Sequence, residues 1–319
     1  MALGQLATFN NEHGFEFCST PYLTILIEWS FEKTAFTICY QTIPSENEFV
    51  DFNESGKRIR SLAAEAFTVK QSLFSSPIIV LQSLAASITI YQTEWEYINQ
   101  LLMAFSAFYY DQLIPMDNFE SQLLLLLTQQ RYNYAQLDKF NTLLNIWIDR
   151  GLTIPTQIAL MTEKSGADFN SIVSSAIGAI SGQQEGKVIE KSINNILSLT
   201  VSQVDSFIHQ SKKRNELIDG FTDQKQSDFD IHMIDLTRKV AEIIAEQNPQ
   251  YQQIFGMADF FAIEVGKKRG LMPTIEFYTG LCLHFLEVPQ QLFCIFISFS
   301  QILGWQAHIA KNQEIHFGE

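Results

Sequence analysis

Histidine and cysteine, the side chains most used for acid–base, nucleophilic and metal chemistry, are scattered singly along this sequence. No two histidines stand three or four residues apart, and no two cysteines form a CxxC pair. His284 and His308 lie in apolar segments, where a hydrogen-bonded core histidine is more common than a ligand. The cysteines fit reduced, mostly buried thiols of a cytosolic protein. The full set is His13, His209, His232, His284, His308, His316, Cys18, Cys39, Cys282 and Cys294.

Short motifs that carry a mechanism by themselves are also missing. The sequence contains no glycine-rich phosphate loop, no HExxH, no GxSxG and no cysteine–histidine spacing typical of a metal site. Residue types and spacing therefore predict no particular reaction. Any site has to be assembled by elements that are distant in the sequence.

The length and charge of the chain limit the class of protein. The chain has 319 residues, 46% of them hydrophobic, which is enough for a sizeable core and roughly two domains. Its 35 Asp and Glu outnumber its 21 Lys and Arg, giving a formal net charge of −14. Nucleic acids and anionic membrane surfaces are bound by clustered positive charge. The charge balance therefore argues against both kinds of partner.

Other features indicate a soluble, cytoplasmic protein. The first ten residues, MALGQLATFN, have neither the basic nor the apolar region of a signal peptide. The most apolar stretch, 292–305 (LFCIFISFSQILGW), is shorter than a membrane span. With only 15 glycines and 8 prolines, the chain has few of the turn residues that a β-sandwich requires.

The spacing of apolar residues predicts an all-α protein with more than a dozen helices. Apolar residues recur close to every 3.6 positions, and no segment alternates with period two for long enough to demand a strand. The stretch 77–81 (PIIVL) is ambiguous, with helix favoured. A helix is expected to end at Gly151, at the position where glycine is common. Helix starts are predicted at Ser30, at Ser45 with Glu48, at Thr93 with Glu96, and at Asp168.

One predicted helix has a face almost without side-chain bulk. Ser174, Gly178 and Gly182 recur every four residues, which lets a second helix approach closely. In a soluble protein such a face packs more often within the chain than against another subunit.

The C-terminal third resembles the signature region of the citrate synthase family. The run TIEFYTGLCLHFLEVPQQLFCIFISFSQILGWQAHI begins like the family's NVDFYSG motif and ends like its GWIAH motif. Upstream, SSAIGAISGQQEGKVIE is similar to the family's AAIGALKGPLHGGANE, and LIDGFTDQKQSDFDIHM to its GFGHRVYK segment. DRGLTIPTQIAL and WSFEKTAFTICYQTIPSENEFVDF also have family counterparts. Retained residues include Phe277, Tyr278, Gly280, Gly304, Trp305, Ala307 and His308.

The resemblance covers nearly the whole chain in order, and it identifies a divergent, catalytically degenerate member of the family. It implies an all-α, citrate synthase-like fold with a large helical domain and a smaller mobile one. The expected boundaries are 1–211 and 289–319 for the large domain and 212–288 for the small one. It also implies a homodimer, with Ser174, Gly178 and Gly182 in the subunit interface.

The family joins an acyl-CoA to a 2-oxo acid, with an aspartate as base and histidines that stabilise the enol and polarise the oxo acid. Matched to this sequence, the two histidine positions of GPLHG and GFGHR become Glu185 and Asp223. The aspartate base becomes Glu276, which is a longer carboxylate. The resemblance therefore implies three acids where the family has two histidines and an aspartate.

The substrate-binding positions differ as well. The family's arginines fall on Gln224, His232 and Gln301, and its DHxLN histidine falls on Arg150. An earlier histidine of the family becomes Trp147. In the family, an arginine segment from the partner subunit completes the site, and no counterpart of that segment is expected in this sequence, which reaches Glu319. The family's CoA ester has thus lost its expected anchors, so no cofactor is predicted.

These replacements oppose the binding of anionic substrates. Two like charges about 4 Å apart repel by ~4 kcal/mol at an effective dielectric constant of 20. An ionised carboxylate also has no proton to donate to an enolate oxygen. Ordinary citrate synthase activity is therefore not expected.

Three interpretations follow. In the first, the protein is a pseudoenzyme that acts as a binding or regulatory homodimer. In the second, the cleft is repurposed, and Glu185, Asp223 and Glu276 bind a metal cation or an amine, with Arg150 and His232 at the rim. In the third, the protein is a divergent acyl-CoA-dependent acyltransferase with Glu276 as base, and its oxyanion donor is unidentified.

Overall fold

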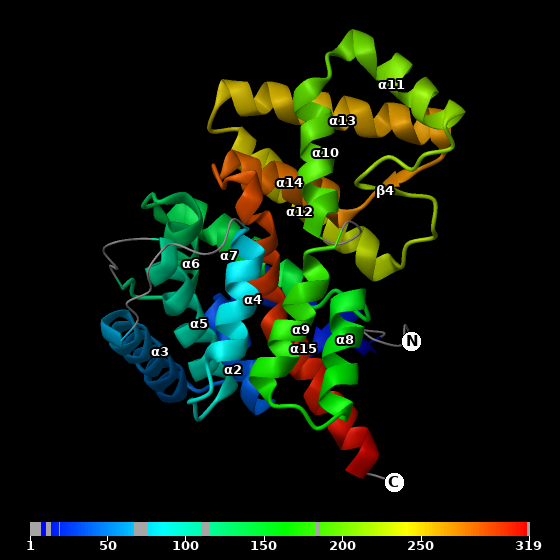
Figure 1. The fold of residues 1–319 in the computed structure, drawn as a ribbon. Helices are drawn as coiled ribbons and strands as arrows, with labels where there is room; N and C mark the ends of the chain where they lie inside the picture. Colours follow the sequence, from blue (N-terminus) through cyan, green and yellow to red (C-terminus); the bar gives the residue numbers. More distant parts are fainter. Residues whose placement is uncertain are drawn as a thin grey trace. The chain divides into compact units, whose positions relative to one another are not determined.

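The computed structural model describes residues 8–10, 14–18, 20–66, 76–109, 115–182 and 186–317, and most of these residues are helical (Figure 1). They fall into two compact units. The first unit comprises Met1–Gly182 and Cys294–Glu319, and the second comprises Gln183–Phe293. The expected small domain, 212–288, lies within the second unit and begins only at the last turn of its second helix.

The first unit contains ten α-helices and a three-stranded antiparallel sheet in its described part. The strands are β1 (Thr8–Asn10), β2 (Gly14–Phe17) and β3 (Thr20–Pro21), in the order β1-β2-β3. The helices are α1 (Tyr22–Glu28), α2 (Phe31–Tyr40), α3 (Glu46–Ala66), α4 (Pro77–Ser87), α5 (Glu94–Tyr109), α6 (Phe119–Thr128), α7 (Tyr134–Ile148), α8 (Ile154–Lys164), α9 (Phe169–Ile180) and α15 (Phe293–Phe317).

The second unit is built from five α-helices, one short 3-10 helix and a two-stranded antiparallel ladder in its described part. The elements are α10 (Gly186–Ser198), α11 (Val201–Lys213), β4 (Phe221–Thr222), α12 (Asp228–Ala245), α13 (Pro249–Arg269), β5 (Met272–Pro273), α14 (Ile275–Phe285) and η1 (Gln290–Leu292). The total of fifteen α-helices in the described residues confirms the predicted all-α class. The five strands, of two to four residues each, are too short to produce a recognisable alternation.

Most predicted helix starts are confirmed by their capping bonds. The Ser30 Oγ accepts from the Lys33 N–H at 3.2 Å, and the Ser45 and Glu48 side chains form the reciprocal bonds of a capping box. The ambiguous stretch 77–81 is helical in α4. The C′ glycine predicted at Gly151 is misplaced by one residue, because α7 ends at Ile148 and an extended Asp149 is its C-cap.

Helix α15 forms the core of the first unit. Its Phe296 ring packs against Phe140 of α7, and its Phe299 ring packs against Phe119 of α6. The prediction that this stretch is too short for a membrane is wrong on length, because 290–312 is helical and apolar over 23 residues. In the most apolar window, 94% of the residues are buried inside the structure, so packing against neighbouring helices accounts for this apolar surface.

In the second unit, α14 packs against α10 and α12. A Cβ on Gly280 would lie 3.2 Å from the backbone oxygen of Ile189, so α14 approaches α10 closely at this glycine. The guanidinium of Arg238 on α12 forms two hydrogen bonds with the carboxylate of Asp259 on α13. This bidentate pair fixes the two helices relative to each other.

Candidate functional site

Two of the predicted acids, Asp223 and Glu276, flank the β4–β5 ladder of the second unit. Phe221 pairs with Pro273, and the Thr274 N–H donates to the Gly220 oxygen at 2.8 Å. The ladder therefore joins the segment of Gly220 and Phe221 to the start of α14, although about fifty residues separate the two in the sequence.

Gly220 is required at this junction for two reasons. Its φ of +84° lies in the left-handed region, and a Cβ there would be 2.9 Å from the Ser192 Cβ and 3.2 Å from the Phe277 Cβ. The adjacent Phe221 ring packs edge-on against Phe277 with 4.9 Å between the ring centroids. Glycine thus lets the loop approach α10 and α14 closely.

The ladder carries the two acids in opposite directions. The two strands are antiparallel, with Thr222 opposite Met272. Asp223, which follows β4, therefore lies at the end of the ladder where β5 begins, and Glu276, which follows β5, lies beyond the opposite end. Asp223 is exposed, and Glu276 is half-buried in the first turn of α14. A carboxylate in a first turn is favoured by the helix dipole, so Glu276 also has a structural role.

Gln224 and His232, two predicted substrate-binding residues, are both exposed. The Gln224 N–H donates to the Thr222 Oγ1 at 3.0 Å, which closes a turn after β4. The His232 Nδ1 lies 2.6 Å from the Asp228 oxygen in the previous turn of α12 and donates to it in the Nδ1–H tautomer. Both contacts are local.

Arg150 and Gln301, the other predicted substrate-binding residues, belong to the first unit. The Arg150 guanidinium lies 5.3 Å from the centroid of the Trp147 ring, in a cation–π contact. Gln301 is 3% exposed in α15, and its Oε1 has no hydrogen-bond partner among the described residues. Position 301 is therefore a core position of this unit.

His308 is a satisfied core histidine, as its apolar surroundings predicted. Its Nε2 lies 3.0 Å from the Asp149 Oδ1, and both side chains are almost fully buried. Gly304, one turn earlier on α15, lies so close to the end of α7 that a Cβ would overlap the Ile148 oxygen. This close approach brings the turn that carries His308 to the end of α7.

Glu185, the third predicted acid, lies outside the described residues. Among the residues that the structure describes, no three His, Cys, Asp or Glu side chains are arranged to hold a metal ion. The four cysteines are described and form no disulfide with one another, and burial raises the pKa of the Cys39 thiol to about 12.

The small-residue face of α9 has a partner within the same chain. The Ser174 Oγ donates to the Gln82 oxygen on α4 at 3.0 Å, and a Cβ on Gly178 would lie 2.6 Å from the Gln82 Nε2. Gly182 is exposed at the end of the helix. Close packing against α4 thus accounts for the small residues at 174 and 178, whereas the subunit interface stays a prediction.

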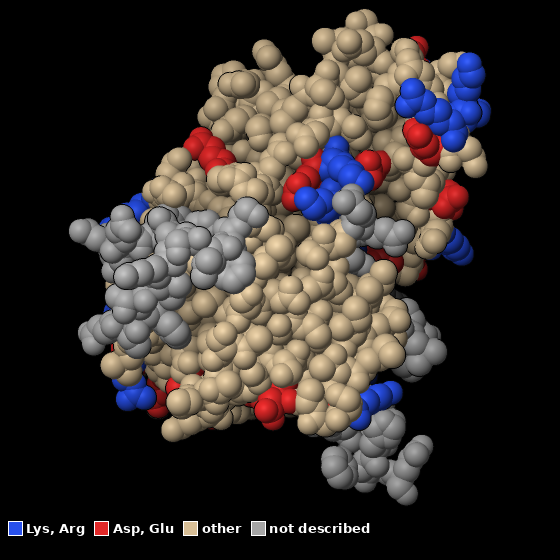
Figure 2. All heavy atoms as spheres, viewed as in Figure 1, with Lys and Arg blue, Asp and Glu red and all other residues tan. Residues whose placement is uncertain are grey.

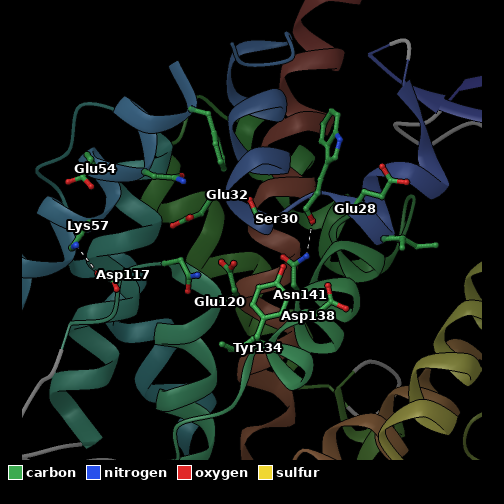
Figure 3. Close-up of a pocket in the computed structure, with 16 residues that line it drawn as sticks. Glu28, Ser30, Glu32, Glu54, Lys57, Asp117, Glu120, Tyr134, Asp138 and Asn141 are labelled. Atoms are coloured by element: carbon green, nitrogen blue, oxygen red, sulfur yellow. Dashed lines mark hydrogen bonds and ion pairs between the residues drawn. The ribbon is translucent and has the colours of Figure 1, made fainter. Parts of the chain in front are cut away.

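A pocket that no sequence motif indicated lies in the first unit. It has a volume of about 620 Å³ and is lined by six carboxylates (Figure 3). Its walls come from the ends of α1, α2, α3, α6 and α7, which span more than a hundred residues. Each acid, taken alone, resembles an ordinary surface residue of an acidic protein. The acids are Glu28, Glu32, Glu54, Asp117, Glu120 and Asp138.

Comparison with known proteins identifies the family. Residues 21–316 match the family model described as citrate synthase, C-terminal domain. Citrate synthase of Haloferax volcanii is 21% identical over 332 aligned positions, covering 93% of this chain and 86% of that protein. 2-Methylcitrate synthase 2 of Corynebacterium glutamicum is 20% identical, covering 89% and 81%. Citrate synthase of Thermoplasma acidophilum, in a ternary complex with carboxymethyl coenzyme A and oxaloacetate, superposes with a TM-score of 0.79 at 16% identity over 98% of this chain and 90% of that one. The chain belongs to the citrate synthase family.

Proposed function

We propose that this protein is a cytoplasmic member of the family that does not catalyse citrate synthesis and acts as a binding or regulatory homodimer. The observation that carries the proposal is the contrast between two sets of residues. The glycines at 220, 280 and 304 make close contacts, and they stand in the GF, FYTG and GW motifs that resemble the family. The positions matched to catalytic histidines hold acids at 185 and 223.

The replaced residues remove the chemistry that the family reaction needs. Asp223 takes the place of a histidine that polarises the oxo acid, and an ionised carboxylate repels a dicarboxylate and donates no hydrogen bond. Gln224 takes the place of an arginine, so a bidentate contact with a carboxylate is lost. Glu276 still supplies a base, but a base alone does not stabilise the enolate.

With oxaloacetate and acetyl-CoA, we expect no release of free CoA thiol above the uncatalysed rate. A thiol-reactive chromophore measures this release, and calorimetry is expected to show no binding of either compound in the micromolar range. Activity lost in Glu276→Gln and kept in Asp235→Asn, an exposed acid on α12, would contradict the proposal.

That contrary result would instead support the divergent acyltransferase, for which the first-turn position of Glu276 is the favourable observation. The repurposed cleft predicts a different outcome. There, Mg²⁺ or an amine would raise the melting temperature, and Glu185→Gln would abolish the effect.

The surface of the first unit supports the homodimer. Figure 2 shows that the face carrying α4, α8 and α9 is almost free of charged groups, although the chain has a net charge of −14. Exposed apolar side chains on or near these helices include Met161 at 71%, Ile79 at 47% and Ile154 at 47%. An extended uncharged face with exposed apolar residues is typical of a subunit interface.

In solution, we expect a mass of about twice 36.5 kDa by light scattering. Met161→Glu, which places a charge on the exposed surface of α8, is expected to shift the protein toward the monomer at micromolar concentration. Ile263→Glu is the matched control, because Ile263 is 54% exposed on α13 of the second unit. A wild-type monomer, or equal dissociation in both variants, would contradict the interface.

A further inference from the structure

The residues that line the carboxylate-lined pocket of the first unit include none of the positions matched to the family's chemistry. It lies where the ends of α1, α3, α6 and α7 meet the start of α2 (Figure 3). Trp29, Phe49, Tyr134 and Leu137 add apolar wall, and Tyr134 is 86% exposed. A volume of about 620 Å³ is within the range of small-molecule sites.

The pocket carries more negative than positive charge. Lys57 is the one basic residue among those that line it, and its Nζ is paired with the Asp117 carboxylate at 2.7 Å. Asp138 is paired with Lys139 at 2.8 Å. The inner end holds two further acids, Glu32 and Glu120, which are almost fully buried, and burial raises the pKa of both carboxyl groups.

These inner acids, Glu32 and Glu120, differ in how they are satisfied. Glu32 Oε1 accepts from the Phe119 N–H at 3.0 Å and lies 3.6 Å from the Arg60 guanidinium. Glu120 is 7% exposed, and its Oε2 has no hydrogen-bond partner among the described residues. In Figure 3, the Glu120 carboxylate projects from the wall toward the middle of the pocket. A buried acceptor without a donor lowers the stability of the fold, so a ligand that donates a hydrogen bond to Glu120 would be favoured.

A second unpartnered acceptor lines the same pocket. The Asn53 Oδ1 on α3 is buried and has no partner in the described part of the chain. Arg60, a buried cation 3.6 Å from Glu32, donates to the Asn99 Oδ1 at 2.6 Å and to the Asp117 oxygen at 2.7 Å, and its Nε has no partner among the described residues. With Glu120 ionised, both orphaned atoms are acceptors, and a ligand that brings hydrogen-bond donors and positive charge would favour that ionised form.

We propose that this pocket binds an aliphatic amine with two or more ammonium groups. One ammonium donates to Glu120 and Asn53 at the inner end, and another interacts with the rim carboxylates of Glu28 and Glu54. An ammonium has three donors and no acceptor, which suits a site whose free groups are all acceptors. The exposed face of Tyr134 offers a further contact for a cation.

A metal ion fits the pocket less well than an amine. No group of three metal-ligating side chains is formed by the described residues, whereas a divalent cation takes six or more oxygen ligands. The carboxylates are also spread around a pocket much larger than one ion. A chain with separated charges matches both the volume and the spread.

The test is a calorimetric titration of the full chain with spermidine at fixed ionic strength. Glu120→Gln, which keeps the shape and removes the charge, is expected to weaken binding at least tenfold. Glu54→Gln, at the rim, is expected to weaken it severalfold, and it serves if Glu120→Gln does not fold. Asp51→Asn is the matched control, because Asp51 is an exposed acid on the same helix outside the pocket.

Several outcomes would overturn the proposal. These are no binding of spermidine, equal losses in Asp51→Asn and Glu54→Gln, or Mg²⁺ binding that depends on Glu120 and displaces the amine. If tetralysine bound in a way that depends on Glu120 and spermidine did not bind, the ligand would be a lysine-rich peptide. The proposal of a free amine would then be wrong. Glu185→Gln should leave spermidine binding unchanged, which separates this pocket from the family's cleft.

Discussion

Gly304→Ala is expected to prevent the first unit from folding stably, with a loss of at least ~3 kcal/mol in the free energy of unfolding. A Cβ at this position would overlap the carbonyl oxygen of Ile148 and lie 2.9 Å from its carbonyl carbon. Backbone atoms at the end of α7 have little freedom to move, so the two helices must separate. Separation would also break the buried contact between His308 and Asp149.

The measurement is urea unfolding followed by circular dichroism, with the soluble yield as a second readout. Gly256→Ala is the control, because Gly256 is an exposed helical glycine on α13 with nothing within 4 Å of its added Cβ. Alanine should stabilise that helix by about 0.5–1 kcal/mol. If both variants unfold at the wild-type midpoint, the close approach of α15 to α7 is wrong.

Glu32→Gln is expected to stabilise the protein increasingly as the pH rises from 5 to 8. Burial, together with the charge of Glu120, raises the pKa of Glu32 from its ordinary value of 4.5 to about 8, although Arg60 opposes the shift. Between these values the folded protein keeps the proton and the unfolded chain loses it. The contribution of Glu32 to the free energy of unfolding therefore falls as the pH rises through this window.

Glutamine keeps an oxygen that accepts from the Phe119 N–H, and it has no charge to desolvate. The variant therefore does not lose stability as the pH rises in the way that the wild type does. The free energy of unfolding of the variant minus that of the wild type should rise by on the order of 3 kcal/mol across the window. Urea melts at pH 5, 6, 7 and 8 measure it. Asp51→Asn, an exposed acid, should give a flat difference, and a flat difference for Glu32→Gln would show that this carboxyl ionises normally.

Local sequence signals predicted most helices because helix starts depend on neighbouring residues. Ser30 and Ser45 cap helices with bonds to residues three positions later, and such spacing is visible in a sequence. The end of α7 was misplaced because a tertiary contact determines it. Asp149 is held in an extended conformation, where its carboxylate accepts from the Gly151 N–H and contacts His308 on α15.

The sites show the same division. Family motifs in the sequence predicted one cleft for Asp223 and Glu276, and the β4–β5 ladder brings the segments that carry them together, although the two acids lie beyond opposite ends of it. The pocket at Glu120 carries no motif, because its walls come from five helices whose acids are not spaced regularly. An orphaned acceptor is recognisable only when all of its neighbours are in place.

The sequence by itself determined the all-α class and the family, and its motifs predict that acids replace the family's catalytic histidines. These depend on periodicity and on motifs whose residues are close together in the chain. Only the tertiary structure decided that Ser174 and Gly178 pack on α4, that Gln301 is a core residue, and that an acid-lined pocket exists. Burial and electrostatic coupling depend on distances in space between residues that are far apart in the sequence, and only the folded chain defines these distances.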